Sequence, residues 1–138
     1  MQRSGLPLVK RVSASDRITL HFRKTELACR CRRGAGCDAA PMDGRFMERL
    51  EKIRVQWGFP LIVTSGVRCP WWNTKVGGSP RSQHLFGKGV DFYFDDPNHA
   101  TAFVALAEKH GYGGIGAGIH LVHLDCRDGH ARWTYDDK

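Results

Sequence analysis

Two histidines and one aspartate in this chain have the residue types and the spacing of a set of metal ligands. His84 and Asp91 lie close together in the segment 82–91, Ser-Gln-His-Leu-Phe-Gly-Lys-Gly-Val-Asp, and His123 follows in a later segment. Imidazole nitrogens and carboxylate oxygens are ligands that zinc accepts, and a hydrolytic zinc ion keeps three protein ligands and leaves its fourth position to water. His84, Asp91 and His123 therefore predict a Zn²⁺ site with hydrolytic chemistry.

The elements on either side of this ligand set are predicted to hold it rigidly. Gly87 and Gly89 allow a tight turn into an apolar and aromatic run that ends at Phe94, which is typical of a β-strand. Asp91 would project from that strand, and His84, which precedes the turn, can fold back beside it.

The segment that carries His123 alternates with a period of two, which is typical of a half-buried strand. Within residues 121–127, Val122, Leu124 and Cys126 fall on one face, whereas His123, Asp125 and Arg127 fall on the other. The pattern gathers the polar side chains on one side of the sheet.

At these residues the chain resembles the M15-type zinc D-Ala-D-Ala carboxypeptidases and related peptidoglycan endopeptidases, which are common among phage endolysins. Their signature is Ser-x-His-x-x-Gly-x-Ala-x-Asp followed by a later His-x-Asp. Ser82, His84, Gly87 and Asp91 match it, Gly89 stands at the alanine position, and residues 123–125 supply the second part. Further similarity in residues 64–70, 73–78, 114–116 and 132–133 extends the resemblance over nearly the whole chain.

The resemblance implies a zinc-dependent peptidase that acts on peptidoglycan stem peptides, at a D-Ala-D-Ala terminus or at an internal bond such as L-Ala-D-Glu. It also implies that Arg68 faces the substrate, where a guanidinium suits a carboxylate or an amide carbonyl, and that Ser82 hydrogen-bonds the substrate backbone. An ion pair outside the substrate site is the alternative for Arg68. The alternative for the whole chain is a non-catalytic, zinc-containing module that binds the cell wall or builds a phage particle.

The general base is left open by the sequence. Family relatives often carry an acidic residue three positions before the second histidine ligand, and His120 occupies that position here. An imidazole titrates near neutral pH and could accept the proton. Asp125 is the other candidate, although it could instead orient His123 as a hydrogen-bond partner.

The composition is that of one soluble globular domain with an anionic partner. The chain has 138 residues and a net charge of +7, which favours the anionic bacterial envelope. The basic residues lack a zinc-knuckle spacing or an aromatic RNA-binding signature, so we expect no nucleic-acid partner, and a nucleic-acid-binding protein is kept as a further alternative. We expect a monomer without a membrane span or a signal peptide, which is made in the cytoplasm and reaches the wall through holin-type release.

Five cysteines form an odd set, so they cannot all pair within the chain. Cys29, Cys31 and Cys37 with His21 nearby could suggest a second zinc site, but the spacing is not that of a CxxC pair and no clear fourth ligand is evident. We therefore expect small buried thiols in a compact N-terminal loop, with at most one disulfide after export.

The predicted fold is α+β, with a small antiparallel sheet, helices on one face and the zinc cleft on the other. Residues 1–16 are expected to be a flexible lead, and residues 17–138 the peptidase domain. Strands are predicted at 18–22, 61–64, 89–94, 121–127 and 131–135, and helices at 25–28, 41–57 and 97–110. The glycine-rich segment 111–118 is expected to bend flexibly into the His123 strand, and the last strand to pair back on that strand through Asp128-Gly129.

Overall fold

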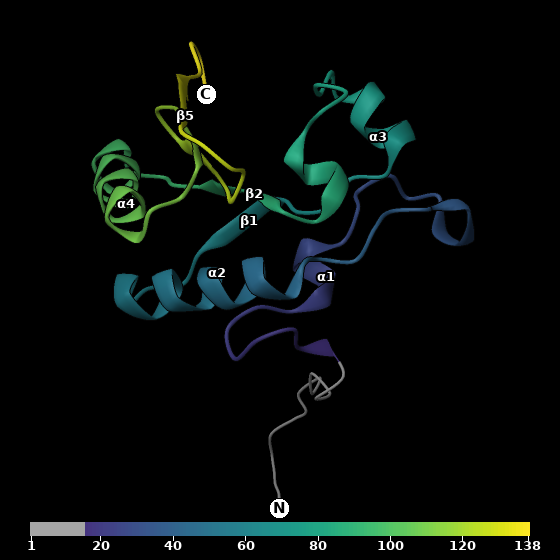
Figure 1. Cartoon of the computed structure of the whole chain (residues 1–138), viewed down its shortest axis with the longest axis horizontal. Helices are drawn as coiled ribbons and strands as arrows, with labels where there is room; N and C mark the ends of the chain where they lie inside the picture. The colour runs from purple at the N-terminus through teal and green to yellow at the C-terminus, as the bar shows by residue number, and fades with distance from the viewer. Residues whose placement is uncertain (1–15) are drawn as a thin grey trace, which may run out of the picture.

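The computed structural model describes residues 16–138, so the expected lead 1–16 lies almost entirely outside the described residues. A five-stranded sheet with helices around it forms a single α+β domain, as predicted (Figure 1). The strands are β1 (Ile62–Ser65), β2 (Gly89–Tyr93), β3 (Gly114–Ala117), β4 (Leu121–Asp125) and β5 (Ala131–Thr134). The helices are α1 (Lys24–Leu27), α2 (Gly44–Trp57), α3 (Pro70–Lys75) and α4 (Pro97–His110), with the short 3₁₀ turns η2 (Gly34–Gly36) and η3 (Gln83–Phe86).

The sheet has the strand order β1-β2-β4-β3-β5, which differs from the expected arrangement at its C-terminal end. The pairs β1–β2, β2–β4 and β4–β3 are antiparallel, whereas β3–β5 is parallel, so the sheet is mixed. The prediction that the last strand pairs with the His123 strand is wrong. Since β2 and β3 already occupy both edges of β4, β5 cannot pair with β4 and joins the outer edge of β3 instead.

Two local predictions also need correction. Residues 18–22 do not form a strand but a tight loop closed by a hydrogen bond from the Ile18 amide to the Phe22 carbonyl, 2.9 Å long. The glycine-rich segment does not merely bend, because its residues 114–117 form β3 and pair with β4. The short helix expected at 25–28 is present as α1, one residue earlier.

Helix α4 begins and ends where the sequence predicts, whereas α2 ends as predicted but begins at Gly44, three residues after the predicted start. The Asp43 carboxylate caps α2 by accepting from the Phe46 amide at 2.9 Å, and Asp96 caps α4 by accepting from the Asn98 amide at 2.8 Å. Both helices end at a glycine in the left-handed conformation, Gly58 (φ 82°) and Gly111 (φ 75°).

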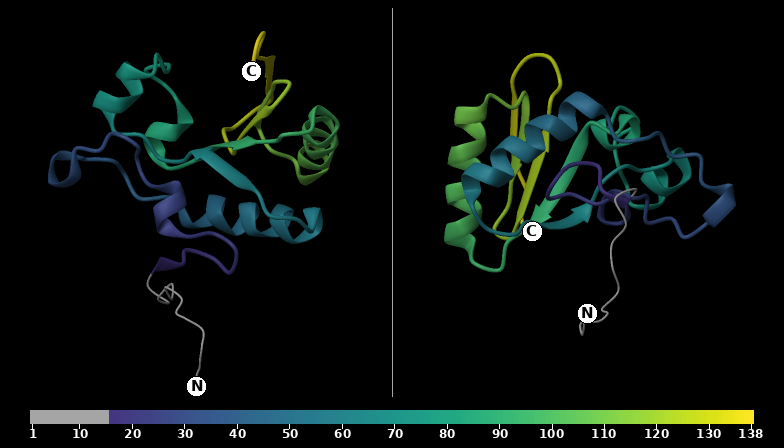
Figure 2. Two further views of the ribbon diagram at one scale, coloured as in Figure 1. Left: turned by 180° about the vertical axis from the view of Figure 1, so that it is seen from behind. Right: turned by 90° about the horizontal axis from the view of Figure 1, so that it is seen from below.

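The apolar faces of α2 and α4 and of the sheet share one hydrophobic core. Phe103 of α4 lies at its centre, with its ring centroid 5.6 Å from that of Phe92 on β2 and 5.2 Å from that of Trp57 on α2. Val122 and Leu124 of β4 are fully buried in the same core. Figure 2 shows α2 crossing the sheet and α4 running alongside it, while α3 and η3 lie at the other side of β1 and β2. The residues between those core positions on β2 and β4 therefore face away from the helices.

Candidate active site

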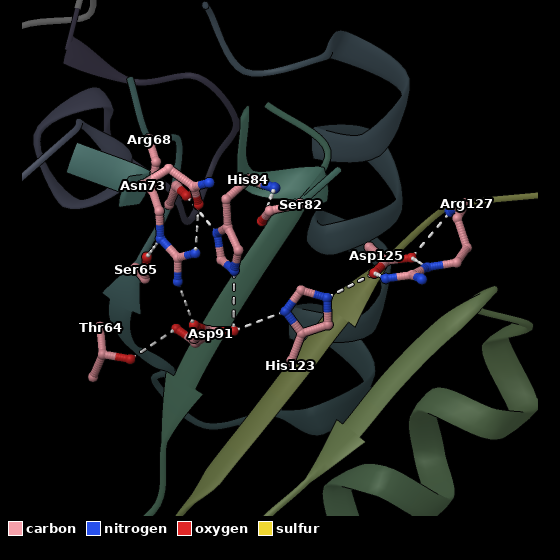
Figure 3. Close-up of polar contacts among 11 residues, drawn as sticks. Thr64, Ser65, Arg68, Asn73, Ser82, His84, Asp91, His123, Asp125 and Arg127 are labelled. Carbon is pink, nitrogen blue, oxygen red and sulfur yellow. Dashed lines mark hydrogen bonds and ion pairs between the residues drawn. The ribbon is translucent and has the colours of Figure 1, made fainter. Parts of the chain in front are cut away.

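Asp91 and His123 lie opposite each other on the antiparallel strands β2 and β4. The Nδ1 atom of His123 is 2.8 Å from Oδ1 of Asp91. Both side chains project from the sheet face opposite α2, as Figure 3 shows. The period-two alternation predicted from the sequence thus places this pair on the polar face.

His84 is brought to the same point by the turn that precedes β2. The Ser82 hydroxyl oxygen caps η3 by accepting from the His84 amide at 3.2 Å, and Gly87 ends η3 with φ 68°. The His84 Nε2 atom then lies 3.3 Å from Oδ1 of Asp91. One ligand atom from each of His84, Asp91 and His123 lies within 4.8 Å of the others, and all three residues are buried.

The second nitrogen of each imidazole is held by a protein acceptor. Nδ1 of His84 donates to the Gly66 carbonyl at 2.7 Å, which leaves the lone pair of Nε2 directed at Asp91. Nε2 of His123 lies 2.7 Å from Oδ2 of Asp125. Outer hydrogen bonds of this kind orient metal-binding histidines and fix their tautomer. The donor set therefore fits a divalent metal ion held by two nitrogens and one carboxylate.

Asp125 is itself held by Arg127, two residues further along β4. The Arg127 guanidinium donates through Nε and Nη2 to the two carboxylate oxygens, at 2.9 and 2.7 Å, and Asp125 is completely buried. Burial alone would raise the pKa of Asp125, but the hydrogen bonds from His123 and Arg127 outweigh it and hold that pKa well below its ordinary range. Asp125 therefore stays ionised with both oxygens engaged.

Asp91 and His123 also shift each other's pKa. Burial opposes ionisation of Asp91, yet its hydrogen bonds to His123 and His84 leave its pKa well below the ordinary value. Burial likewise disfavours the charged form of His123, but Asp125 and Asp91 together raise its pKa. His123 therefore favours its protonated form, in which each ring nitrogen pairs with one carboxylate.

A cleft of about 330 Å³ opens over the three candidate ligands. Arg68 and Ser82, the two residues expected to bind substrate, both line it, and Trp133 and Tyr135 form another part of its wall. Among the described residues that line the cleft, Asp91 has the one acidic side chain, whereas Arg68 and Arg127 are both basic. The cleft is therefore suited to a ligand that carries a carboxylate.

Arg68 is fixed at the rim of the ligand set. Its Nη2 lies 3.5 Å from Oδ2 of Asp91, its Nε donates to the Ser65 hydroxyl at 3.2 Å, and its Nη1 donates to Oδ1 of Asn73 at 3.2 Å. Arg68 thus forms an ion pair, but its partner is a candidate ligand, and the guanidinium lines the cleft.

His120 does not join this cluster. Its Nδ1 atom lies 2.9 Å from the Phe94 carbonyl oxygen, its ring stacks on Tyr93, and it is not among the residues that line the cleft. Of the two residues considered as the base, the structure brings only Asp125 to the ligands, in contact with His123.

Sequence reasoning missed the aromatic side of the cleft. The ring centroid of Trp133 lies 5.1 Å from that of His123. The Arg127 guanidinium carbon also lies over the Trp133 ring, 5.1 Å from its centroid. Trp133 reaches this position through the parallel pairing of β5 with β3, in which it lies opposite Gly116. No local periodicity encodes that pairing, so only the similarity at residues 132–133 pointed to this residue.

Comparison with known proteins agrees with the geometry. The model of the family described as Peptidase M15 matches residues 20–126, which include all three candidate ligands and Arg68. No curated protein sequence matches the chain.

Proposed function

Because the chain belongs to the Peptidase M15 family, we propose that it is a zinc-dependent peptidase that hydrolyses a peptide bond in the stem peptides of bacterial peptidoglycan. The observation that carries the proposal is the convergence of His84, Asp91 and His123, in which the second nitrogen of each imidazole is already fixed by the protein. Such a preorganised set of three protein ligands is what a hydrolytic metal centre needs.

A bound zinc ion would supply Lewis acidity toward the scissile carbonyl and toward water. The protein's own contribution begins with Arg127, which keeps Asp125 ionised through two hydrogen bonds. Asp125 in turn keeps the proton of His123 on Nε2 and leaves the Nδ1 lone pair free for the metal site. We therefore assign Asp125 as a positioning residue, because both of its oxygens are engaged and a strongly lowered pKa makes it a poor proton acceptor.

The side of the cleft that carries Arg68 would bind the substrate. The Arg68 guanidinium is anchored by Ser65 and Asn73 and adjoins the ligand set, so it can hold a carboxylate or a carbonyl next to the bond that is cut. A stem peptide offers such a group at a D-Ala-D-Ala terminus and at an L-Ala-D-Glu link. Ser82 contributes its hydroxyl at the same wall, where it also caps η3.

A setting in phage or prophage lysis accords with the chain's resemblance to endolysins and with its charge of +7, which favours the anionic envelope. Among the described residues, no helix has the length and apolar character to span a bilayer.

The placement of His120 favours a second candidate, a module that binds the wall without cutting it. The position that carries an acidic residue in many relatives holds a histidine here, and that histidine lies outside the cleft. Such a module would keep the metal and the affinity for peptidoglycan but would release no amine.

One experiment separates the two candidates. Purified protein is incubated with purified peptidoglycan, and released amines and product masses are measured before chelation, after chelation and after zinc is returned. A peptidase loses and regains amine release, and the product mass identifies the bond. His123→Gln should be inactive, whereas His99→Gln, which changes an exposed histidine on α4, should match the wild type. Wall binding without amine release in every state would favour the non-catalytic module.

A further inference from the structure

The sulfur atoms of four cysteines converge in a second cluster that includes none of the candidate ligands His84, Asp91 and His123. The Sγ atoms of Cys29, Cys31, Cys37 and Cys69 all lie within 4.8 Å of one another, and all four residues carry free thiols. We propose that this cluster is a second metal site, which binds one structural Zn²⁺ through four thiolates. The proposal does not rest on the proposed peptidase activity.

The geometry favours one shared metal ion over a pair of disulfides. Zinc–sulfur bonds of about 2.3 Å in a tetrahedral site place the sulfurs roughly 3.8 Å apart, which accords with a cluster in which every pair is close. A disulfide would draw two sulfurs together to about 2.05 Å and leave the other two as a separate pair. Four thiolates that close the coordination sphere are typical of structural zinc sites, and soft sulfur ligands select zinc over Mg²⁺ or Ca²⁺.

Cys69 is the fourth ligand that the sequence did not reveal. It lies at the N-cap of α3, far along the chain from the other three, and it is completely buried. The Cys69 amide donates to Sγ of Cys29 at 3.3 Å, so the backbone itself joins the two segments at the cluster.

Additional N–H groups point at the sulfurs. Sγ of Cys69 accepts from the Trp72 amide at 3.4 Å and from Nη2 of Arg33 at 3.3 Å. Sγ of Cys31 accepts from the Arg33 amide at 3.4 Å. A zinc ion with four thiolates carries a net charge of −2, and donors aimed at sulfur stabilise that charge.

The backbone around Cys31 adopts a conformation that the local sequence does not favour. Arg32 has φ 60°, in the left-handed region that a residue with a side chain rarely adopts. This turn directs the Arg33 amide at Sγ of Cys31. Between α1 and α2 the chain has only the three-residue turn η2 as regular structure, so a metal would supply the constraint that hydrogen-bonded elements do not.

The site would fix one wall of the active-site cleft. Cys69 directly follows Arg68, which contacts Asp91, and it begins the helix that carries Asn73, the partner of Arg68. Zinc would therefore tie the loop at residues 29–37 to the segment that positions Arg68. Binding replaces the four thiol protons, which pass to solvent, and requires no oxidant.

The first test counts zinc per chain by mass spectrometry in protein purified without chelator or reductant. The two sites together predict two zinc ions per chain. Cys37→Ala should lose one, His123→Gln should lose the other, and Cys126→Ala should keep both, since Cys126 lies outside the cluster beside Arg49. Equal zinc content in the wild type and in Cys37→Ala would overturn the proposal. The zinc content of His123→Gln reports on the peptidase centre and not on the cysteine cluster.

Two measurements on the wild type keep the proposal testable if Cys37→Ala does not fold. Four thiols should resist alkylation until a chelator is added, and Co²⁺ substitution should give the intense sulfur-to-cobalt charge-transfer absorption of a tetrathiolate site. Disulfide-linked peptides among these four cysteines, or thiols that react fully without chelator, would show that no metal is bound there.

Discussion

Asp91 and His123 face each other across β2 and β4, with Oδ1 and Nδ1 2.8 Å apart, and Asp125 contacts the opposite side of the same imidazole at 2.7 Å. His123 is thus held between two carboxylates, one of which belongs to the candidate ligand set and one of which is fixed by Arg127. The chemistry of the site depends on this arrangement, because it decides which nitrogen of His123 is free to bind a metal.

Replacing Asp125 should weaken metal binding at this centre. In Asp125→Asn the amide binds His123 and Arg127 less strongly, so the Nδ1 lone pair is no longer held toward Asp91. Loss of such an outer partner typically costs about 10–100-fold in metal affinity or activity. Competition with a fluorescent chelator measures the affinity, and the exposed Asp137→Asn is the matched control. An unchanged affinity in Asp125→Asn would contradict the positioning role.

The stability of the protein should respond to pH in opposite directions with and without metal. In chelated protein the protonated His123 pairs with two carboxylates, and its raised pKa means that this stabilisation is complete below the ordinary value of about 6.5 and is lost as the pH rises through the raised value. Metal must displace that proton, so its stabilising effect grows over the same range. The gap in Tm between loaded and chelated protein should therefore widen as the pH rises.

Calorimetric Tm measurements between about pH 6 and pH 8 check this behaviour. The contribution of His123 to Tm is the difference in Tm between the wild type and His123→Gln. Both proteins contain the cysteine cluster, so its titration cancels in this difference. A Tm difference between the two chelated proteins that grows with pH would mean that the sign is wrong.

His120 should be dispensable for catalysis. Its ring is engaged with the Phe94 carbonyl and with Tyr93 and does not line the cleft. His120→Gln should therefore retain kcat within about threefold of the wild type and keep the shape of its pH profile, because a lost general base costs about 10²-fold or more. A fall of that size, with loss of one limb of the pH profile, would restore His120 as the base.

Gly114 should tolerate no side chain. A Cβ at this position of β3 would collide with the carboxylate of Asp125 on β4. Gly114→Ala should lower the free energy of unfolding by about 1–3 kcal/mol, as overpacking does, and should weaken metal binding by displacing Asp125. Gly44→Ala is the control, because a Cβ there meets nothing and the helical position favours alanine. Denaturant unfolding and metal competition measure the two effects, and equal stability of the two variants would contradict the packing argument.

Much of the site could be predicted because its residues obey local rules. The alternation of β4 placed His123 and Asp125 on the polar face, and the turn at Gly87 brought His84 back to Asp91. The general base was harder to assign. The position of His120 in the sequence does not show that its ring binds the Phe94 carbonyl, outside the cleft.

The sequence by itself determined the helices α1, α2 and α4, the ends of the two long ones and the identity of the candidate ligands, because side-chain periodicity and capping act over a few residues; it did not predict α3. Only the tertiary structure decided that β5 lies parallel to β3, which carries Trp133 to the cleft, and that Cys69 meets Cys29, Cys31 and Cys37. Both contacts join segments that are distant in the chain. They depend on which strand edges remain free and on how the loops pack, and neither is encoded in any local pattern.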